Sequence, residues 1–407
     1  MPRRPSCPRP RLLVAALALT LLPVVGCGKP DSAADAGRSQ TPSTAPTTLP
    51  KAGDGSAATA PDGPGSVPGS LAGSIPGVPP SNNIYEHTGP GDVSPALAGV
   101  PSRVYVPNTE SDSVDVIDPA TFKVVDHFAV GRQPQHVTPS WDLKQLFVDN
   151  DLGDTLTPID PTTGKPGPTI PVTDPYNLYF TPDGAHAIVV AERLMRLDFR
   201  DPHTWAVQNS LSVPYGGVDH MDFSADGTYL LVSAEFSGWV IKIDLQKMAI
   251  AATLQVGGQP IDVKLSPDGR VFYVANQSRN GVSVIDAVDM KELAFISTGK
   301  GAHGLYASRD AKSLYVTNRL AGSVSVIDFA TRKVTATWTV GGSPDMGGVS
   351  ADGTQLWLSG RYDKDVYVID TRDGKRLARI PVGRGPHGLC LFPQPGRFSM
   401  GHTGVYR

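Results

Sequence analysis

From about residue 102 onward, apolar and polar residues alternate in short runs separated by turn-forming residues. Seven of these runs, among them SVDVIDP, WVIKIDL and SVSVIDA, contain alternating apolar positions and carry an aspartate near their ends. A period of two residues with many β-branched side chains predicts strands that bury one face. The seven aspartates are Asp118, Asp160, Asp198, Asp244, Asp286, Asp328 and Asp370.

A second marker repeats every 42 residues along the same region. It follows an apolar run such as YVAN and comprises Asn108, Asn150, Glu192, Ala234, Asn276, Asn318 and Gly360. Each repeat supplies four predicted strands, for example PIDVKLSPDG, RVFYVAN, GVSVIDA and ELAFIST. This period with several short strands is typical of a β-propeller. The sequence therefore predicts an all-β fold, a seven-bladed β-propeller of four-stranded blades.

The ring is expected to close with strands from both ends of the chain. The stretch SPALAGV, which precedes the first strong strand, is poor in strand-forming residues. HGLCLF, near the C-terminus, is followed by no further strands of its own blade. We expect HGLCLF to complete the first blade.

The repeats also carry a family signature, because Tyr315–Asn318 reads YVTN. Over roughly residues 102–393 the chain resembles the YVTN β-propeller repeat family. The resemblance implies an extracytoplasmic seven-bladed propeller, similar in form to propeller lactonases, virginiamycin B lyase and the propeller of nitrous oxide reductase. It implies the fold and not the activity, since one fold hosts many functions.

The N-terminal region is expected to direct export and anchoring. Residues 1–26 combine a basic start with an apolar run, which is typical of a signal peptide, and VVGC resembles a bacterial lipobox. This predicts acylation of Cys27 and attachment to the outer face of the cytoplasmic membrane, or a periplasmic location. Residues 27–95, rich in Pro, Gly, Ser, Ala and Thr, are predicted to form a disordered tether. Residues 96–407 form the predicted propeller.

Charge and cysteine content narrow the possible partners. The formal net charge is −3, and the signal segment carries four arginines and no acid, so its removal leaves a more negative chain. Such a body without a Lys/Arg run argues against nucleic acid as a partner. Apart from Cys7 and Cys27, only Cys390 remains, so no intrachain disulfide is expected. We expect a monomer stabilised by its core.

One residue pair per repeat is expected to open the innermost strand at one end of the axial channel. The pairs are Gln135–His136, Tyr176–Asn177, Asp219–His220, Ile261–Asp262, His303–Gly304, Asp345–Met346 and His387–Gly388. Four of the nine histidines fall in this register. Imidazole ligands with carboxylate support favour a divalent transition metal, Cu or Zn. The predicted ligands are His136, His220, His303 and His387, with possible support from Asn177, Asp219, Asp262 and Asp345.

Two features leave alternatives open at this register. His136 and His220 stand one residue later than His303 and His387, so their side chains could point elsewhere. The histidines could also form hydrogen bonds across a hydrated channel without any metal.

A second ring is predicted beside the first, because the second strand runs antiparallel to the innermost one. Arg193, Glu235, Arg319 and Arg361 directly follow the 42-residue marker. Guanidinium groups favour carboxylate or phosphate ligands. The predicted ligand at this mouth is a small anion or a protein partner, and a solvated charged loop face is the alternative.

Two functions are compatible with this pattern. One is an exported, membrane-tethered propeller that binds a ligand or partner at its mouth, with or without a metal ion. The other is a metal-dependent extracytoplasmic enzyme of the lyase, lactonase or oxidase class that uses the axial histidines. The absence of a nucleophile elbow, a phosphate loop or a CxxC motif favours the first.

Overall fold

The computed structural model describes residues 83–402 and 404–407. The predicted signal peptide, Cys27 and most of the predicted tether lie outside this part of the chain. Residues 83–95, the last of the predicted tether, pack against the propeller and so belong to the folded unit: Tyr85 is buried, and its hydroxyl donates to the Leu265 carbonyl at 2.7 Å. In the described part, no helix combines the length and hydrophobicity that crossing a membrane would require.

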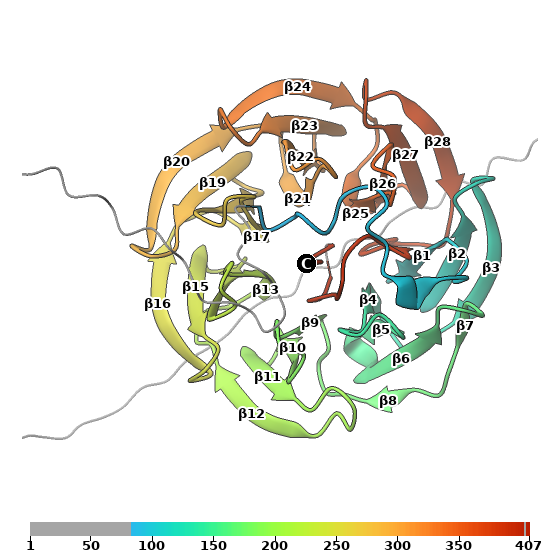
Figure 1. Ribbon diagram of the computed structural model, residues 1–407, viewed down its shortest axis with the longest axis horizontal. Helices are drawn as coiled ribbons and strands as arrows, with labels where there is room; N and C mark the ends of the chain where they lie inside the picture. The colour runs from blue at the N-terminus through green and yellow to red at the C-terminus, as the bar shows by residue number, and fades with distance from the viewer. Residues whose placement is uncertain (1–82, 403) are drawn as a thin grey trace, which may run out of the picture. The chain divides into compact units, whose positions relative to one another are not determined.

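Seven antiparallel sheets stand around a central axis, which confirms the predicted all-β, seven-bladed propeller (Figure 1). We number the blades along the chain, from the inner to the outer strand. Blade 1 contains β29 (Cys390–Phe392), β1 (Arg103–Asn108), β2 (Ser113–Asp118) and β3 (Lys123–Ala129). Blade 2 contains β4 (Pro134–Pro139), β5 (Leu146–Asn150), β6 (Thr155–Asp160), β7 (Lys165–Pro166) and β8 (Ile170–Pro171). Blade 3 contains β9 (Asn177–Phe180), β10 (Ala187–Ala191), β11 (Arg196–Arg200) and β12 (Val207–Ser212).

The other four blades follow the chain in the same order. Blade 4 contains β13 (Val218–Phe223), β14 (Tyr229–Ala234), β15 (Trp239–Asp244) and β16 (Ala249–Gln255). Blade 5 contains β17 (Pro260–Leu265), β18 (Phe272–Asn276), β19 (Gly281–Asp286) and β20 (Lys291–Ser297). Blade 6 contains β21 (Ala302–Ala307), β22 (Ser313–Asn318), β23 (Ser323–Asp328) and β24 (Lys333–Thr339). Blade 7 contains β25 (Pro344–Val349), β26 (Gln355–Gly360), β27 (Asp365–Asp370) and β28 (Arg376–Pro381).

Two short 3₁₀ helices complete the described elements, η1 (Pro95–Leu97) and η2 (Asp151–Gly153). Blade 2 departs from the pattern because its outer strand is broken into β7 and β8, which both pair with β6. Pro166 ends β7 and Pro168 lies in the break, and neither can donate a backbone hydrogen bond to a neighbouring strand.

The ring closes as predicted, through pairing of the two ends of the propeller. Strand β29 pairs with β1, and Tyr105 lies opposite Cys390. Seven clusters of buried apolar side chains fill the spaces between neighbouring blades, each drawing on two adjacent sheets. Since the closing contact joins residues almost 290 apart in sequence, the C-terminal strand is part of the core of the fold.

The innermost strand of five blades begins with a β-bulge. In blade 2, Pro134 pairs with Asn150 and Val137 pairs with Val148, so Gln135 and His136 together face one residue of β5. The pairing of β13, β17, β21 and β25 shifts at the same point. A bulge re-aims the side chains of the extra residue. The predicted channel pairs of these five blades are the bulged residues.

Most of the repeated VID aspartates have the structural role expected of strand ends. The carboxylate of Asp118 accepts from the Ala120 amide at 2.9 Å, and Asp286 accepts from the Val288 amide at 2.8 Å. Asp198, in the irregular third repeat, is different because it is buried between Arg196 and Arg200. These aspartates stabilise turns and strand ends away from the axis.

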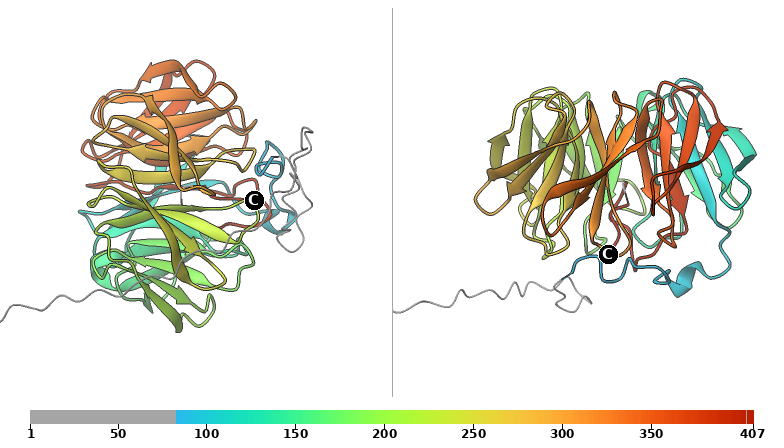
Figure 2. Two further views of the ribbon diagram at one scale, coloured as in Figure 1. Left: turned by 90° about the vertical axis from the view of Figure 1, so that its left-hand side faces the viewer. Right: turned by 90° about the horizontal axis from the view of Figure 1, so that it is seen from above.

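The two ends of the described chain meet at the face of the propeller where the innermost strands end (Figures 1 and 2). The Ile84 amide donates to the Pro267 carbonyl at 2.8 Å, just beyond β17. The Gly396 amide donates to the Asp92 carbonyl at 3.1 Å. After β29 the chain turns into the axial channel and ends near its centre. We call this side the closed face and the opposite side, where the innermost strands begin, the mouth.

Candidate functional site

Five buried histidines converge on the axis at the level of the bulges. The ring centroid of His136 lies 4.0 Å from that of His402, 4.8 Å from His387 and 5.4 Å from His220. The rings of His303 and His387 are 6.3 Å apart. All four predicted histidines therefore come together, despite the one-residue offset between the two pairs. His136, His220 and His303 belong to bulges, in which consecutive residues can reach the axis.

The ligand atoms divide into two groups. Single ligand atoms of His136, His220 and His402 all lie within 4.8 Å of one another, and so do those of His303, Asp345 and His387. We call these the three-histidine group and the His–Asp–His group. Metal–nitrogen bonds are about 2.0–2.1 Å long for Zn, so small ring movements would bring either set onto one ion. Both groups contain enough potential ligand atoms to hold a metal ion.

One hydrogen bond orients the His136 ring and decides which of its nitrogens carries the proton. Its Nδ1 lies 2.9 Å from the Tyr176 carbonyl oxygen, and a carbonyl can only accept, so Nδ1 carries the proton. The lone pair is then on Nε2, which is buried and makes no hydrogen bond with the described residues. A backbone carbonyl on the second nitrogen is the arrangement that commonly orients a metal-binding histidine.

His220 is held by neighbours from blade 3 and by its own strand. Its Nδ1 lies 2.9 Å from Asn177 Nδ2 and 3.1 Å from the Tyr179 hydroxyl, and its Nε2 lies 3.3 Å from Asp219 Oδ1. The Ser233 hydroxyl, opposite the bulge, accepts from the His220 amide at 3.2 Å. Asn177 and Asp219, predicted as possible support for the histidines, thus both lie next to His220.

The glycine of the HGL sequence is required by this packing. A Cβ atom added to Gly388 would lie 2.0 Å from Cδ2 of His136 and 2.7 Å from Cε1 of His402. Only a residue without a side chain allows the two rings to approach the backbone of the closing segment. Gly304, in the second copy of the sequence, would meet the Tyr306 hydroxyl at 2.4 Å for the same reason.

The His–Asp–His group is organised around Asp345. One carboxylate oxygen lies 3.1 Å from His303 Nδ1 and 3.0 Å from Arg319 Nε, and the other lies 3.6 Å from His387 Nε2. The Arg319 side chain is only 12% exposed, so this ion pair is largely shielded from water. The Met346 thioether also lies 3.2 Å from His303 Nδ1. Asp345 thus already has a positive partner.

Burial keeps all five histidines neutral. It lowers the pKa of His136 to about 3, and it lowers the pKa values of the other four well below the usual range. Nearby positive charge acts in the same direction, with Arg361 lowering the pKa of His387 and Arg319 that of His303. A neutral imidazole is the form that binds a metal.

The two groups differ in their fitness for a cation. The His–Asp–His group contains a guanidinium that already pairs with its carboxylate, and a divalent ion would have to compete with that charge. The three-histidine group has only neutral rings as ligands, and three histidines with an open position are a known zinc-binding set. The donor set therefore favours a transition metal in the three-histidine group.

The predicted rim residues have unequal surroundings. Arg193 is paired with three aspartates, Asp151 at 3.4 Å, Asp154 at 3.2 Å and Asp174 at 2.8 Å, and is 43% exposed. No described contact links it to the histidines. Its charge is already balanced, which makes Arg193 a poor anion-binding residue.

Arg319 and Arg361 lie closer to the axis. Arg319 Nη1 donates to the Tyr362 hydroxyl at 3.1 Å, on the adjacent blade. Arg361 Nη1 is buried and makes no hydrogen bond with the described residues. Burial raises the pKa of Glu235, and the charges of Arg319 and Arg361 oppose this shift. Arg361 thus offers an N–H donor to an incoming acceptor.

Asp262 does not join the histidines, although it occupies the predicted register. Its carboxylate accepts from the Val263 amide at 2.9 Å and from the Leu305 amide at 2.7 Å on the next blade. Asp222 binds the Leu265 amide in the same way at 2.8 Å. Asp262 is therefore a strand-linking residue, because one of its oxygens accepts from an amide of its own strand and the other from an amide of the neighbouring innermost strand.

Sequence reasoning missed His402, which lies after the last repeat. It belongs to residues 397–402 and 404–407, which fold back on themselves inside the channel. The Arg397 amide donates to the Arg407 carbonyl at 2.7 Å, and the Met400 amide donates to the Val405 carbonyl at 2.7 Å. We call this segment the C-terminal hairpin. The available signal was the sequence GHTG, a histidine between glycines in a tail too short to form another blade.

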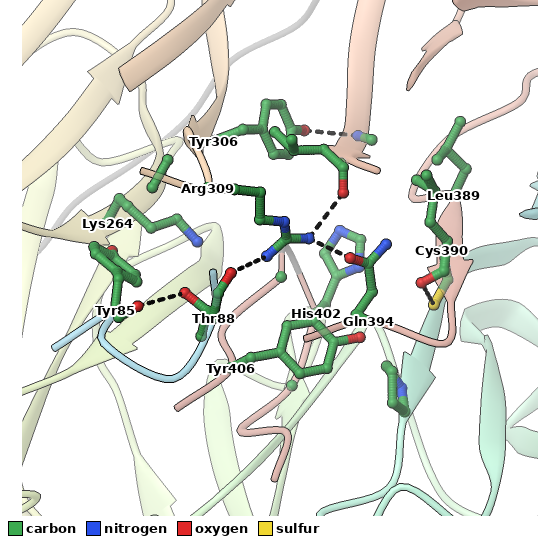
Figure 3. Close-up of a pocket in the computed structure, with 18 of the residues that line it drawn as sticks. Tyr85, Thr88, Lys264, Tyr306, Arg309, Leu389, Cys390, Gln394, His402 and Tyr406 are labelled. Atoms are coloured by element: carbon green, nitrogen blue, oxygen red, sulfur yellow. Dashed lines mark hydrogen bonds between the residues drawn. The ribbon is translucent and has the colours of Figure 1, made fainter. Parts of the chain in front are cut away.

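A small cavity lies on the closed-face side of His402 (Figure 3). Its volume is about 50 Å³, and Lys264, Tyr306, Arg309 and Tyr406 contribute to its lining. Such a volume accommodates a few water molecules. It is too small for an organic ligand, so this cavity does not provide a second ligand site.

Comparison with known proteins establishes the family. The chain belongs to the YNCE-like beta-propeller family, whose model matches residues 68–396. No curated protein matches the chain. The C-terminal hairpin, which carries His402, lies beyond the range matched by the family model.

Solved structures share the fold at low identity. A functionally unknown protein from Desulfotomaculum acetoxidans superposes with a TM-score of 0.62 at 16% identity, covering 71% of this chain and 98% of that one. The periplasmic gluconolactonase PpgL of Pseudomonas aeruginosa gives 0.61 at 20% identity, with 72% and 99% coverage. The dihydro-heme d1 dehydrogenase NirN in complex with DHE gives 0.56 at 19% identity, with 71% and 74% coverage. These similarities concern the fold alone.

Proposed function

We propose that this protein is an exported, lipid-anchored propeller that binds a transition-metal ion among its axial histidines and a small anionic ligand at its mouth. The observation that carries the proposal is the buried Nε2 of His136, which makes no hydrogen bond with the described residues, in a ring that lies against those of His402 and His220. A buried polar atom without a partner is costly unless something else satisfies it. His136 and His220 are the strand-borne ligands of this ion.

The ligand chemistry selects the kind of metal. Neutral imidazoles suit Zn and Cu, whereas Ca and Mg prefer oxygen ligands. When bound, the ion would act as a Lewis acid toward a ligand atom at an open coordination position. The protein would supply the buried site, the orientation of His136 through the Tyr176 carbonyl, and the neutral state of the rings.

The anionic ligand is assigned to the side of the mouth near Arg361. The unpaired Nη1 of Arg361 provides a charge-assisted donor, and the Tyr362 hydroxyl lies beside Arg319. His387 is close to both Arg361 and the three-histidine group, since its ring is 4.8 Å from that of His136 and the charge of Arg361 lowers its pKa. An anion bound by Arg361 would thus sit next to the metal-binding histidines.

Metal analysis of the protein purified without an affinity tag tests the metal assignment. We expect close to one equivalent of Zn or Cu, or submicromolar binding of Zn²⁺ by the metal-free protein in calorimetry. Ca²⁺ serves as the control and should give no binding heat. A protein that neither retains nor binds Zn or Cu would refute the proposal.

A metal-dependent enzyme is the second candidate, and Glu192 is the observation that favours it. Burial raises the pKa of Glu192 to about 7, with Asp151 and Glu235 adding to the shift. A carboxyl that titrates near neutral pH is suited to general-base chemistry. Since a similar fold is that of a gluconolactonase, hydrolysis of a panel of sugar lactones by the zinc-loaded protein is the assay. Activity lost in Glu192→Gln would support it, and an inactive protein with full metal would exclude this substrate class.

The anchoring part of the proposal rests on Cys27, outside the described residues. We expect Cys27→Ser to move the protein from the membrane fraction to the soluble extracytoplasmic fraction, because no other attachment is proposed. Continued sedimentation with membranes would contradict a single lipid anchor.

A further inference from the structure

The third histidine of the three-histidine group comes from a part of the chain that lies outside the seven sheets. None of the residues 393–402 and 404–407 belongs to the strand order of a blade. His136 and His220, by contrast, lie in β4 and β13. The possible metal site is therefore shared between the blades and the C-terminal hairpin.

The hairpin tip is held at the level of the histidines by backbone contacts with blade 3. The Phe180 amide donates to the Met400 carbonyl at 3.0 Å, and the His402 amide donates to the Leu178 carbonyl at 3.3 Å. Gly401 pairs with Tyr179 and has a φ of 134°, and a Cβ there would lie 2.4 Å from Tyr179 Cδ1. Only glycine lets the tip pass this close to the channel wall.

The base of the hairpin is fixed by apolar packing and by one ion pair. Phe398, Met400 and Val405 are buried in the cluster between blades 3 and 4. Arg407 Nη2 lies 3.0 Å from Asp222 Oδ1. The hairpin thus lies in the channel on the closed-face side, and His402 reaches the rings of His136 and His220.

We infer that the C-terminal hairpin is a metal-latched plug: an ion bound by His136 and His220 takes His402 as its third ligand and so locks the hairpin in the channel. This inference rests on the proposed metal binding. Because undocking breaks no strand pairing within a blade, the hairpin can open as a unit while the propeller remains folded. The bound ion would then join the blades, through His136 and His220, to the hairpin, through His402.

Thermodynamic linkage sets the size of the effect. If docking of the hairpin tightens metal binding by some factor, metal binding must favour docking by the same factor. Coupling between sites is typically about 5–150-fold. We expect saturating Zn²⁺ to slow the opening-dependent exchange of the hairpin amides by about 10–100-fold, and loss of His402 to weaken Zn²⁺ binding by a similar factor.

Hydrogen exchange and calorimetry on the complete propeller test the inference. The reporter amides are Phe180, which donates into the hairpin, and Met400 within it. The test variant is His402→Gln, which keeps a polar side chain of similar size, with His402→Ala as a second variant. The exposed His203→Ala removes a histidine away from the channel and is the matched control.

Three outcomes distinguish the proposals. Zn²⁺-dependent protection of Phe180 and Met400 in the unmodified protein and in His203→Ala, lost in His402→Gln together with weaker binding, supports the latch. Unchanged Zn²⁺ affinity and unchanged protection in a folded His402 variant overturn the latch and leave the proposed metal binding in place. An unmodified protein that binds neither Zn²⁺ nor Cu²⁺ overturns both.

Discussion

Two groups of buried side chains on the same axis both contain histidines but differ in charge and in their neighbours. The His–Asp–His group holds a carboxylate that Arg319 contacts at 3.0 Å. The three-histidine group contains neutral rings, and the Nε2 of His136 has no hydrogen bond in the described protein. The first group contains a carboxylate that a guanidinium already neutralises, and the second contains three imidazole rings without a charged group among its ligands. Ligand type and neighbouring charge together therefore decide which group is the better candidate for a metal site.

The arginines of the predicted rim also differ in their surroundings. Arg319 and Arg361 lie near Asp345, whereas Arg193 does not. Arg193 is neutralised by three aspartates, whereas Arg361 retains an unpaired donor. Equivalent positions in a repeat protein can thus have different functions. The difference arises from residues contributed by neighbouring blades.

The largest expected effect comes from removing the strand-borne ligands of the three-histidine group. The double variant His136→Gln/His220→Gln should bind Zn²⁺ at least about 1,000-fold more weakly, about 4 kcal/mol. At a metal concentration of about 100 times Kd, the ion should stabilise the unmodified protein by about 2.7 kcal/mol. Thermal unfolding with and without Zn²⁺ measures this shift, which should vanish in the double variant.

The matched control for this experiment is His303→Gln/His387→Gln. It should retain most of the Zn²⁺-dependent rise in melting temperature, since those rings belong to the group already balanced by Arg319. If this control loses the shift and the first variant keeps it, the assignment of the two groups is reversed.

The next effect concerns stability without metal. Asp345→Asn should lower the free energy of unfolding by about 3 kcal/mol, because it leaves the largely buried Arg319 without its carboxylate. Chemical denaturation measures the loss. Glu292→Gln, which removes a half-buried ion pair with Arg279 on an outer strand, should cost less than about 1 kcal/mol. Equal losses in both variants would show that the buried Asp345–Arg319 pair contributes no more to stability than an exposed ion pair.

A smaller effect is expected for anion binding. Arg361→Gln should weaken the binding of sulfate, used as a probe, by about tenfold, because one charge-assisted hydrogen bond is lost. Arg193→Gln should change sulfate affinity less than about twofold, since Arg193 is already paired. Calorimetric titration of both variants measures this difference. If Arg193→Gln weakened sulfate binding more than Arg361→Gln, the anion would bind elsewhere on the rim.

The smallest effect is a pH dependence of the same anion binding. Glu192, with a pKa raised to about 7 by burial, is mostly protonated at pH 6 and mostly charged at pH 8. Its added negative charge should weaken sulfate binding about threefold over this range, while sulfate itself keeps its charge. Titrations of the unmodified protein and of Glu192→Gln at both pH values test this, because the variant should show no such decline. A decline of equal size in the variant would exclude Glu192 as its source.

The sequence by itself determined the architecture, because that information is local and repeated. Alternating apolar residues specify each strand, the 42-residue period specifies each blade, and the weak strand propensity before residue 102 pointed to closure by HGLCLF. The same period located His136, His220, His303 and His387 on the axis and Arg319 and Arg361 near the mouth.

Only the tertiary structure decided how these residues group. The grouping of the histidines depends on the bulges of the innermost strands and on contacts across a ring of seven blades. Neither can be derived from the spacing of residues in the sequence. Asp262 and Arg193 stand at the expected positions of the repeat. Asp262 accepts hydrogen bonds from backbone amides, however, and Arg193 is paired with three aspartates. His402 is the clearest case, because it follows the last repeat and reaches the other histidines only when the chain end folds back into the channel. Interactions set by the path of the whole chain, and not by local pattern, form this site.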